Sequence, residues 1–445
     1  MELKKYNANH TQVLKINQIV RTISETHKFD KDKLIAINTS DVENGVMGNG
    51  TLTFVDELKG QFKKTIVKDD ILFSEIRPAN RRFAKVTTKN TKDYVVSTKL
   101  MVLRKYNEDV DLEYFYYCLT NQPFLDILQR RAENRIGSFP QITFDLLSEY
   151  AFPIPPISEQ KRISSVISTL DKKIALNRQI NQNLEAMAKQ LYDYWFVQFD
   201  FPNENGRPYK SFGGKMVWNE KQRKYIPEYW EVKSLSNWLE IKSGFPFKSE
   251  TYKPIGRYKI ITIKNVQDGE LVTSGCDYVN DIPSRAKDYI SLQIGDRLIS
   301  LTGNCGRLCV VCEENLLLNQ RVGLLCCDAI YLEYFYNFLN SGTMRTVIDN
   351  LANGAAQANL SPVELCKTDC FIPPIDILLS YNRKVNAIRK AIVQNNQEIS
   401  QLAKQRDELL PLLMNGQVSV NSDLSVYKKR RGKVPSSIQN DVSDI

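Results

Sequence analysis

This sequence of 445 residues contains very few histidines, and it contains no long apolar run and no visible secretion signal. Its two histidines, His10 and His27, are too few for a histidine-based catalytic centre or a His-rich metal site. No apolar run approaches about 18 residues, which argues against a membrane span. No apolar segment follows the first charged residues, so no secretory signal is visible. We therefore expect a cytoplasmic protein.

Nucleotide-binding and methyl-transfer motifs are also missing. The chain has no G-x-x-x-x-G-K-[ST] phosphate loop, no G-x-G-x-x-G and no Asn-Pro-Pro-aromatic run. Its two Pro-Pro pairs, Pro155-Pro156 and Pro373-Pro374, each follow an isoleucine, which cannot hydrogen-bond an adenine amino group. The sequence predicts no catalytic residues and no cofactor in this chain.

The nine cysteines are an odd number, which argues against a disulfide framework. Cys305, Cys309 and Cys312 have the spacing of a radical S-adenosylmethionine iron–sulfur loop. A zinc site is another alternative, and its further candidate ligands are Cys326, Cys327, Cys366 and Cys370. We favour a glycine turn and a strand in which cysteines replace small apolar residues, with no metal.

Composition is that of an ordinary globular protein, with 42% hydrophobic and 25% charged residues. The length allows two or three domains. The net charge of +9 favours a polyanionic partner. A polar segment, 417–445, contains the basic run Lys428-Lys429-Arg430-Arg431 and is predicted to be a disordered tail that can touch phosphate.

The dominant pattern is an amphipathic segment at 154–196. It opens with Ile154-Pro155-Pro156-Ile157, followed by a predicted N-cap at Ser158, and no glycine or proline interrupts it before Pro202. Apolar residues recur every three or four positions, which indicates a coiled coil. About 40 residues at about 1.5 Å each make a rod of about 60 Å.

The two halves of the chain are copies. Residues 112–119 recur at 332–339 with the Leu-Glu-Tyr-Phe-Tyr pattern, and the prolines at 155–156 recur at 373–374. Asp70, Leu72 and Ser74 recur as Asp296, Leu298 and Ser300. The tyrosine-rich segments are predicted to be helices that pack in a core; the alternative is a base-stacking platform.

The same repeat maps the first apolar seam onto a second helix, with a predicted N-cap at Asp376. An antiparallel pair would bring Asn177 close to Asn395, and we predict that contact. Pro411 is expected to kink or end the second helix. The predicted helix-pairing residues are Ile167, Leu170, Ile174, Asn177, Leu184, Leu191, Val385, Ile388, Ile392, Asn395, Leu402 and Leu409. The alternative is two unrelated helices, each packed on its own domain.

The predicted fold is α+β, with two pseudo-symmetric mixed α/β domains separated by a pair of long antiparallel coiled-coil helices. The predicted boundaries are 1–153 for the first domain, 154–199 for the first long helix, 200–225 for a connector, 226–371 for the second domain and 372–416 for the second long helix. In the first domain we expect strands at 34–37, 71–74, 95–96 and 100–103.

Several segments together resemble the specificity subunit of type I restriction–modification systems. They are the run from Pro155-Pro156-Ile157-Ser158-Glu159-Gln160 to Asp193-Tyr194-Trp195-Phe196, then Gly206-Arg207-Pro208-Tyr209-Lys210, Ile226-Pro227-Glu228-Tyr229-Trp230, Gly295-Asp296-Arg297 and Leu318-Asn319-Gln320-Arg321. The chain departs from the family pattern twice. The first domain has no Ile-Pro-x-x-Trp opening, and Pro374-Ile375-Asp376 replaces a Pro-x-x-Glu-Gln run.

The resemblance implies a DNA-recognition subunit without catalysis. Each target-recognition domain would read one half of a bipartite double-stranded DNA target, and the helices would set the spacing and dock two copies of a methylation subunit. S-adenosylmethionine, ATP and Mg would belong to partner subunits, including a restriction subunit. The predicted rod spans between one and two turns of B-DNA, at roughly 34 Å each.

Two further alternatives remain open. One is a specificity chain of a related phage-defence or fused restriction–modification system. The other is a scaffold whose rod spaces two protein-binding domains.

Basic and polar loop residues are the candidate DNA contacts. Arg81 and Arg307 lie at matching positions of the repeat, and arginine can bind guanine bidentately or a phosphate. The other candidates are Arg77, Asn80, Arg82 and Lys85 in the first copy, and Lys242, Ser243, Phe245, Lys248, Lys264, Asn265 and Asn304 in the second.

Overall fold

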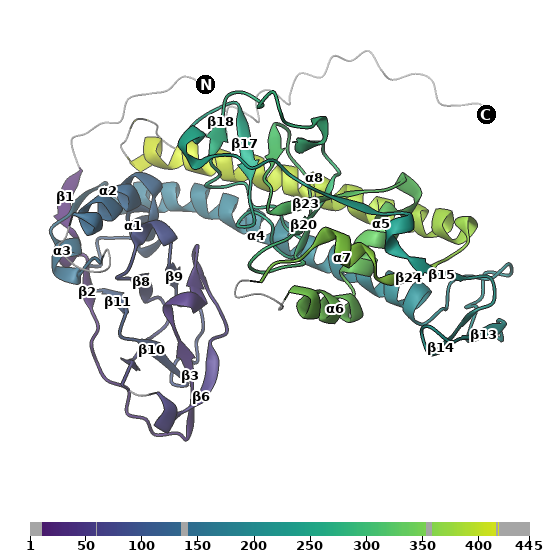
Figure 1. Ribbon diagram of the computed structural model, residues 1–445. Helices are drawn as coiled ribbons and strands as arrows, with labels where there is room; N and C mark the ends of the chain where they lie inside the picture. Colours follow the sequence, from purple (N-terminus) through teal and green to yellow (C-terminus); the bar gives the residue numbers. More distant parts are fainter. Residues whose placement is uncertain (1–10, 59, 135–140, 353–357, 415–416, 418–445) are drawn as a thin grey trace, which may run out of the picture. The chain divides into compact units, whose positions relative to one another are not determined.

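The computed structural model describes residues 11–58, 60–134, 141–352, 358–414 and 417 (Figure 1). These residues divide into two compact units. Unit 1 comprises the described parts of Met1–Lys172 and Ala403–Ile445, and unit 2 is Lys173–Leu402. His10 and nearly all of the predicted tail, including its basic run, lie outside the described residues.

Unit 1 contains two four-stranded sheets and a group of short helices. One sheet, wholly antiparallel, has the order β2 (Val20–Thr22), β11 (Leu100–Lys105), β8 (Ile71–Ser74), β9 (Phe83–Lys85). The other has the order β6 (Thr51–Phe54), β3 (Lys33–Ile37), β10 (Tyr94–Ser97), β7 (Phe62–Lys64), with β3 and β10 parallel. Two further pairs are β1 (Gln12–Lys15) with β12 (Ala151–Ile154), and β4 (Val42–Glu43) with β5 (Val46–Met47). The helices are α1 (Leu112–Thr120), α2 (Gln122–Glu133) and α3 (Phe144–Ser148). The strands expected in this domain are confirmed.

Unit 2 repeats this topology. Its antiparallel sheet has the order β16 (Glu240–Ser243), β23 (Val322–Cys326), β20 (Arg297–Ser300), β21 (Leu308–Val310). Its second sheet has the order β18 (Tyr278–Val279), β17 (Tyr258–Ile261), β22 (Leu316–Leu318), β19 (Ser291–Leu292), with β17 and β22 parallel. The pair β15 (Glu231–Ser234) with β24 (Asp369–Ile372), and helices α5 (Ala329–Leu339), α6 (Gly342–Ala352) and α7 (Pro362–Cys366), complete the match. The sequence repeat is therefore a repeat of strand order and direction.

This match places the start of the first domain. Strand β1 is the counterpart of β15, which directly follows Ile226-Pro227-Glu228-Tyr229-Trp230. The residue before β1 that corresponds to Trp230 is Thr11. The first domain thus forms the same edge pair of strands without the tryptophan opening.

The two long helices are α4 (Ile157–Tyr192), which continues into a π-helical turn at Asp193–Val197, and α8 (Ile375–Met414). Both begin later than predicted, because Ile154 and Ile372 end strands β12 and β24. The predicted caps Ser158 and Asp376 are also wrong, since both lie inside the first helical turn. The first intrahelical hydrogen bonds of α4 start at the Pro156 carbonyl, which accepts the N–H groups of Glu159 and Gln160 at 2.8 and 3.1 Å.

Pro411 does not end the second helix, which continues to Met414. The last turn buries Leu410, Leu413 and Met414 in the core of unit 1, among residues of α1 and α2. A proline so near the end removes one backbone donor, and this apolar burial offsets the loss.

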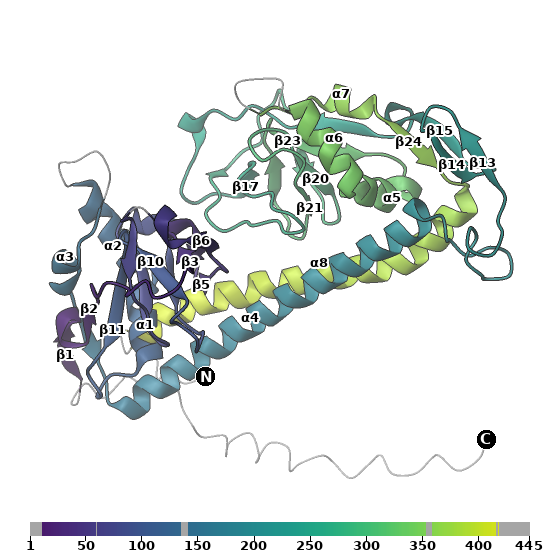
Figure 2. The same cartoon turned by 90° about the horizontal axis from the view of Figure 1, so that it is seen from below.

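The helices pair antiparallel, as predicted. Figures 1 and 2 show α4 and α8 side by side along the part that belongs to unit 2. There Asn181 meets Asn395 and Glu185 meets Arg389, so positions rise along α4 as they fall along α8. Every predicted pairing residue is buried or half-buried.

The predicted contact between Asn177 and Asn395 is wrong. Asn177 Nδ2 donates to Glu398 Oε2 at 2.7 Å, and Asn395 Nδ2 donates to Asn181 Oδ1 at 2.9 Å. The antiparallel register places Asn177 opposite Glu398, nearly one helical turn beyond Asn395. Asn181 also donates to Asn396 Oδ1 at 2.7 Å, so the polar break in the seam is a cluster of asparagines.

The tyrosine-rich helices are core elements. Tyr114 and Tyr334 are fully buried equivalents, and each hydroxyl donates to a backbone carbonyl of the strand that precedes a long helix, Pro153 and Phe371 respectively. Core packing is therefore confirmed for them, and base stacking is not available to rings so placed.

Candidate nucleic-acid interface

The loop between β8 and β9 carries four of the predicted DNA contacts. Arg77 and Asn80 are exposed, and Arg81 and Arg82 are half-buried. Arg77 and Arg81 flank a 3₁₀ turn with φ of 45° and 53°, left-handed values that cost free energy for any residue other than glycine. The loop therefore has one constrained backbone shape that presents the arginines.

The turn between β4 and β5 holds two of these arginines. Arg81 Nε donates to Asn44 Oδ1 at 2.8 Å, and its Nη1 donates to Gln122 Oε1 at 2.6 Å. Arg82 Nη1 lies 3.3 Å from Glu43 Oε2. Gly45, with φ of 89°, closes the turn and donates its N–H to the Phe83 carbonyl at 2.8 Å. Burial, together with the nearby positive charge of Arg406, lowers the pKa of Arg81.

The second copy has the same arrangement at the loop between β20 and β21. Arg307 Nη1 donates to Gln267 Oε1, and its Nε lies 3.9 Å from Asp268 Oδ2. Arg345 of α6 donates to the same Asp268 carboxylate at 2.6 Å and to the Gly306 carbonyl at 3.0 Å. Gly269 donates its N–H to the Leu308 carbonyl at 2.8 Å, as Gly45 does to Phe83.

Backbone pairing corrects the equivalence of the arginines. The N–H of Ser74 donates to the Arg82 carbonyl at 2.8 Å, and that of Ser300 donates to the Arg307 carbonyl at 2.9 Å. The counterpart of Arg307 is therefore Arg82, and the predicted match with Arg81 is wrong by one residue. The reason is that the β8–β9 loop is one residue longer than its copy.

We call each four-residue group a turn–arginine cluster: Glu43, Asn44, Arg81 and Arg82 in unit 1, and Gln267, Asp268, Arg307 and Arg345 in unit 2. Each cluster contains two guanidinium groups and one carboxylate. The carboxylate is two residues before the turn glycine in unit 1 (Glu43) and one residue before it in unit 2 (Asp268). The Asn44-Gly45 and Asp268-Gly269 turns are visible in the sequence at the spacing of the repeat, so Glu43, Asn44 and Gln267 could have been found. Arg345 comes from a different helix and has no such signal.

Other predicted contacts lie elsewhere. Lys85 lies in strand β9, not in the loop, and pairs with Glu113 of α1. Strand β16 is at the opposite edge of the sheet from β21, so Lys242 and its neighbours do not join Arg307. Lys242 lies 3.4 Å from Glu240, and the ring of Phe245 packs 5.1 Å from that of Phe247. Ser243 lies at the end of β16, and Lys248 is exposed.

The side chain of Asn265 forms its hydrogen bonds within its own loop. Its Oδ1 accepts from Thr262 N at 2.8 Å and its Nδ2 donates to the Val272 carbonyl at 2.8 Å, with the side chain buried. It shapes the turn that carries Asp268 and has no free group for a base. Lys264 and Asn304 are exposed.

The three loop cysteines face different surroundings. Cys309 is buried in the core around β17 and β22, whereas Cys305 packs against the core that contains α5 and α6. Cys312 Sγ accepts from Asn396 of α8 at 3.4 Å, and burial raises its pKa to about 11. Thiols placed in this way do not converge on one metal, and no cluster of three or more potential ligands occurs among the described residues. The geometry does not favour the iron–sulfur and zinc alternatives.

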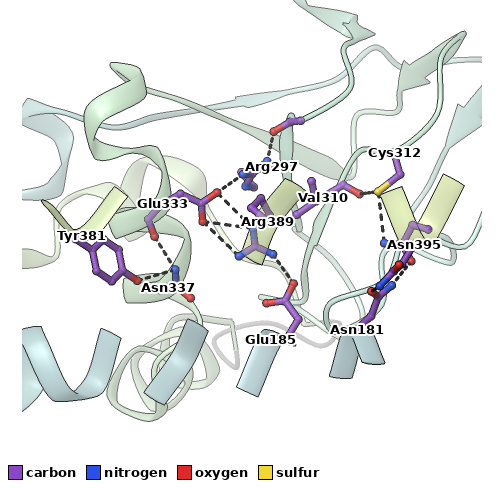
Figure 3. Close-up of polar contacts among 12 residues, drawn as sticks. Asn181, Glu185, Arg297, Val310, Cys312, Glu333, Asn337, Tyr381, Arg389 and Asn395 are labelled. Carbon is purple, nitrogen blue, oxygen red and sulfur yellow. Dashed lines mark hydrogen bonds and ion pairs between the residues drawn. The ribbon is translucent and has the colours of Figure 1, made fainter. Parts of the chain in front are cut away.

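A buried ion network holds the second domain against the helix pair within unit 2 (Figure 3). The Glu333 carboxylate of α5 lies between the guanidinium groups of Arg297 and Arg389, and Arg389 also reaches Glu185 of α4. Burial raises the pKa of Glu333, but the charges of Arg389 and Arg297 outweigh that effect and lower it overall. The network fixes β20, and hence the loop that ends at Arg307, relative to this part of the helices.

The chain thus contains two mixed α/β domains of one topology, each of which presents arginines at a sheet edge. Residues 10–186 match the family model of the type I restriction modification DNA specificity domain. Over 454 residues the chain is 29% identical to the HindI specificity subunit of Haemophilus influenzae, covering 91% of this chain and 98% of that protein. It is 26% identical to the MjaIX specificity subunit of Methanocaldococcus jannaschii over 69% of each.

Among solved structures, the type I restriction–modification S subunit of M. genitalium covers 95% of this chain and all of its own, with a TM-score of 0.48 and 16% identity. The HsdS subunit of Thermoanaerobacter tengcongensis covers 92% of this chain and 98% of its own, with a TM-score of 0.37 and 15% identity. The chain is thus similar, over most of its length, to specificity subunits of type I restriction enzymes, and its first part matches the family model of their DNA specificity domain. No helix among the described residues is long and apolar enough to cross a membrane.

Proposed function

We propose that this chain reads a bipartite double-stranded DNA target, with one half read by the domain at 1–153 and the other by the domain at 226–371. The observation that carries the proposal is the turn–arginine cluster, which recurs at the same loop of two domains of one topology. Two DNA-binding domains that share one fold but differ in their surface side chains can recognise two different half-sites.

The hydrogen-bond partners of the cluster arginines indicate which of them are available to contact DNA. Arg81 is held by the amide oxygens of Asn44 and Gln122, and Arg307 by the amide oxygen of Gln267, with the Asp268 carboxylate farther away at 3.9 Å. A guanidinium group exchanges a neutral amide for the O6 and N7 acceptors of guanine more readily than it leaves a carboxylate. We therefore assign base or phosphate contact to Arg81 and Arg307, and support of the turn to the pairs Arg82–Glu43 and Arg345–Asp268.

The remaining predicted polar residues complete the proposed surface. The exposed Arg77, Asn80, Lys248, Lys264 and Asn304 suit phosphate contacts, which position the protein without reading sequence. We keep Lys242 and Ser243 as members of a separate edge of the second domain. The similarity to specificity subunits supports docking of two copies of a methylation subunit on the paired helices, and of a restriction subunit in the full complex. S-adenosylmethionine, ATP and Mg would be bound by those partners, and the complex would work in the cytoplasm beside genomic DNA.

The test is to map methylated adenines in a host that carries this chain with its methylation partner. We expect one bipartite motif with a fixed spacer, absent when the chain is omitted. Methylation without a motif, or a continuous motif, would overturn the proposal. A specificity chain of a fused or other phage-defence system would instead co-purify with a different partner.

A further inference from the structure

The connector between α4 and the second domain contains an exposed surface that the proposed reading of DNA does not use. It includes a two-stranded hairpin, β13 (Met216–Asn219) and β14 (Lys224–Pro227), which Figure 1 shows next to β15 and β24. No third strand pairs with this hairpin among the described residues. Neither edge of the hairpin therefore has a further strand partner in the described part of the chain.

One face of the hairpin is anchored. Val217 pairs with Ile226, which is buried in the main core of unit 2. On the same face Lys224 lies over the rings of Phe199 and Phe371, at 4.9 and 4.2 Å from their centroids. Burial lowers the pKa of Lys224, because the ammonium group loses solvation there. The hairpin is thus a fixed part of unit 2.

The opposite face is aromatic and exposed. Trp218 and Tyr225 face each other across the strands, with ring centroids 5.3 Å apart, and are 48% and 60% exposed. Tyr229, just beyond β14, is 75% exposed. Lys221 and Arg223 of the connecting turn are exposed and form no ion pair within the described part of the chain, and Glu220 is the acid beside them.

We propose that Trp218 and Tyr225 of this outer face, together with the neighbouring exposed residues Lys221, Arg223 and Tyr229, form a docking surface for a protein partner with an acidic patch. Trp, Tyr and Arg dominate the energetic centres of protein interfaces, and the excess of cations calls for an acidic complement. Duplex DNA is the poorer occupant, because its paired bases are already stacked and give exposed rings nothing to stack on. Under the proposed function, on which this step rests, the partner is the methylation subunit.

The test measures assembly of the full chain with its methylation subunit, using a double variant Trp218→Ala/Tyr225→Ala and a charge variant Lys221→Glu/Arg223→Glu. We expect each to raise the dissociation constant of the complex about tenfold or more, with the charge effect shrinking at high salt. The matched control is Arg285→Glu/Lys287→Glu, a pair of exposed cations with the same spacing in unit 2. It should leave assembly unchanged.

The charge variant touches only the exposed turn, so it reports on docking even where loss of the rings disturbs the hairpin. Unchanged assembly by the charge variant would overturn the inference. So would normal assembly with weakened binding to a random-sequence duplex, which would make the surface a DNA contact. If the wild-type chain itself forms no complex with a methylation subunit, the proposed function fails instead.

Discussion

Under the proposed function, DNA must compete with the groups that hold Arg307. Gln267 is neutral and easily exchanged, but Asp268 places a carboxylate 3.9 Å away and is shared with Arg345. At a turn that contacts DNA as proposed, a carboxylate would repel phosphate and would keep the guanidinium group from binding every duplex equally. Asp268 is therefore expected to contribute to discrimination more than to affinity.

Asp268→Asn tests this role. The loss of the carboxylate leaves two guanidinium groups without a counter-charge, so affinity for a random-sequence duplex should rise by roughly three- to tenfold. The ratio of target to random affinity should fall, as measured by fluorescence anisotropy at two salt concentrations. The reciprocal change Asn44→Asp adds a carboxylate at the equivalent turn and should lower random-duplex affinity. Equal affinities in all three proteins would contradict the role.

Glu333 is the residue on which the buried ion network depends. Glu333→Gln leaves Arg297 and Arg389 buried without their shared carboxylate, which should lower the free energy of unfolding by about 3–5 kcal/mol at pH 7. The control is Glu364→Gln, which removes an exposed carboxylate 2.7 Å from Lys367 and should change stability by no more than about 1 kcal/mol.

The difference in stability between the wild type and Glu333→Gln should depend on pH. The folded-state pKa of Glu333 is lowered, so its stabilisation is fully present above the unfolded-state value of about 4.3 and is lost as the pH falls through the folded pKa. The stability gap between wild type and Glu333→Gln should therefore narrow below about pH 4.3. Urea unfolding at pH 7 and at several acidic values measures it, and a gap that stays constant would refute the assignment.

At the scale of elements, the asparagine cluster defines the register of the helix pair. Asn181 makes side-chain hydrogen bonds to both Asn395 and Asn396. Polar groups that find partners in only one alignment disfavour a helix slipped by one turn. The sequence predicted that each seam contains an asparagine, but the residue that meets Asn395 depends on the antiparallel register.

Asn181→Ala should lower the free energy of unfolding by about 1–3 kcal/mol, because two hydrogen bonds are lost and Asn395 is left without this acceptor. Gln179→Ala, an exposed change two residues away, should be within about 0.5 kcal/mol of wild type. In a double-mutant cycle, Asn181→Ala and Asn395→Ala should be strongly non-additive. Additive losses would mean that the pair does not act as a unit.

Elements with local signals were predictable. The buried strand β3, the tyrosine-rich α1 and α5 and the two long helices follow from periodicity. The predicted starts of the two long helices were a few residues early, because Ile154 and Ile372 end strands β12 and β24. The arginine equivalence failed by one residue, because the difference in loop length lies between strands whose pairing is not visible in the sequence. Lys85 and Asn265 were misjudged for a similar reason: their side chains face partners that only folding brings near.

At the scale of the whole molecule, the duplication predicts separable specificities. Arg81→Ala should relax recognition in one half of the target and Arg307→Ala in the other, each weakening binding by about 1–3 kcal/mol. Mapping methylated adenines for each variant identifies the half affected, and the exposed change Lys287→Gln serves as a control. The proposal of one domain for each half would fail if either arginine relaxed both halves.

The sequence by itself determined that the chain is a duplicated pair of mixed domains with two long amphipathic helices and no recognisable catalytic motif. These properties follow from periodicity, internal repetition and composition, which are all local or additive along the chain. Only the tertiary structure decided which arginines match, why Asp268 and Arg345 belong to the site, and how Glu333 holds the second domain against the helices. Those contacts join residues dozens of positions apart, and the energies that select them come from strand register, burial and charge pairing in three dimensions.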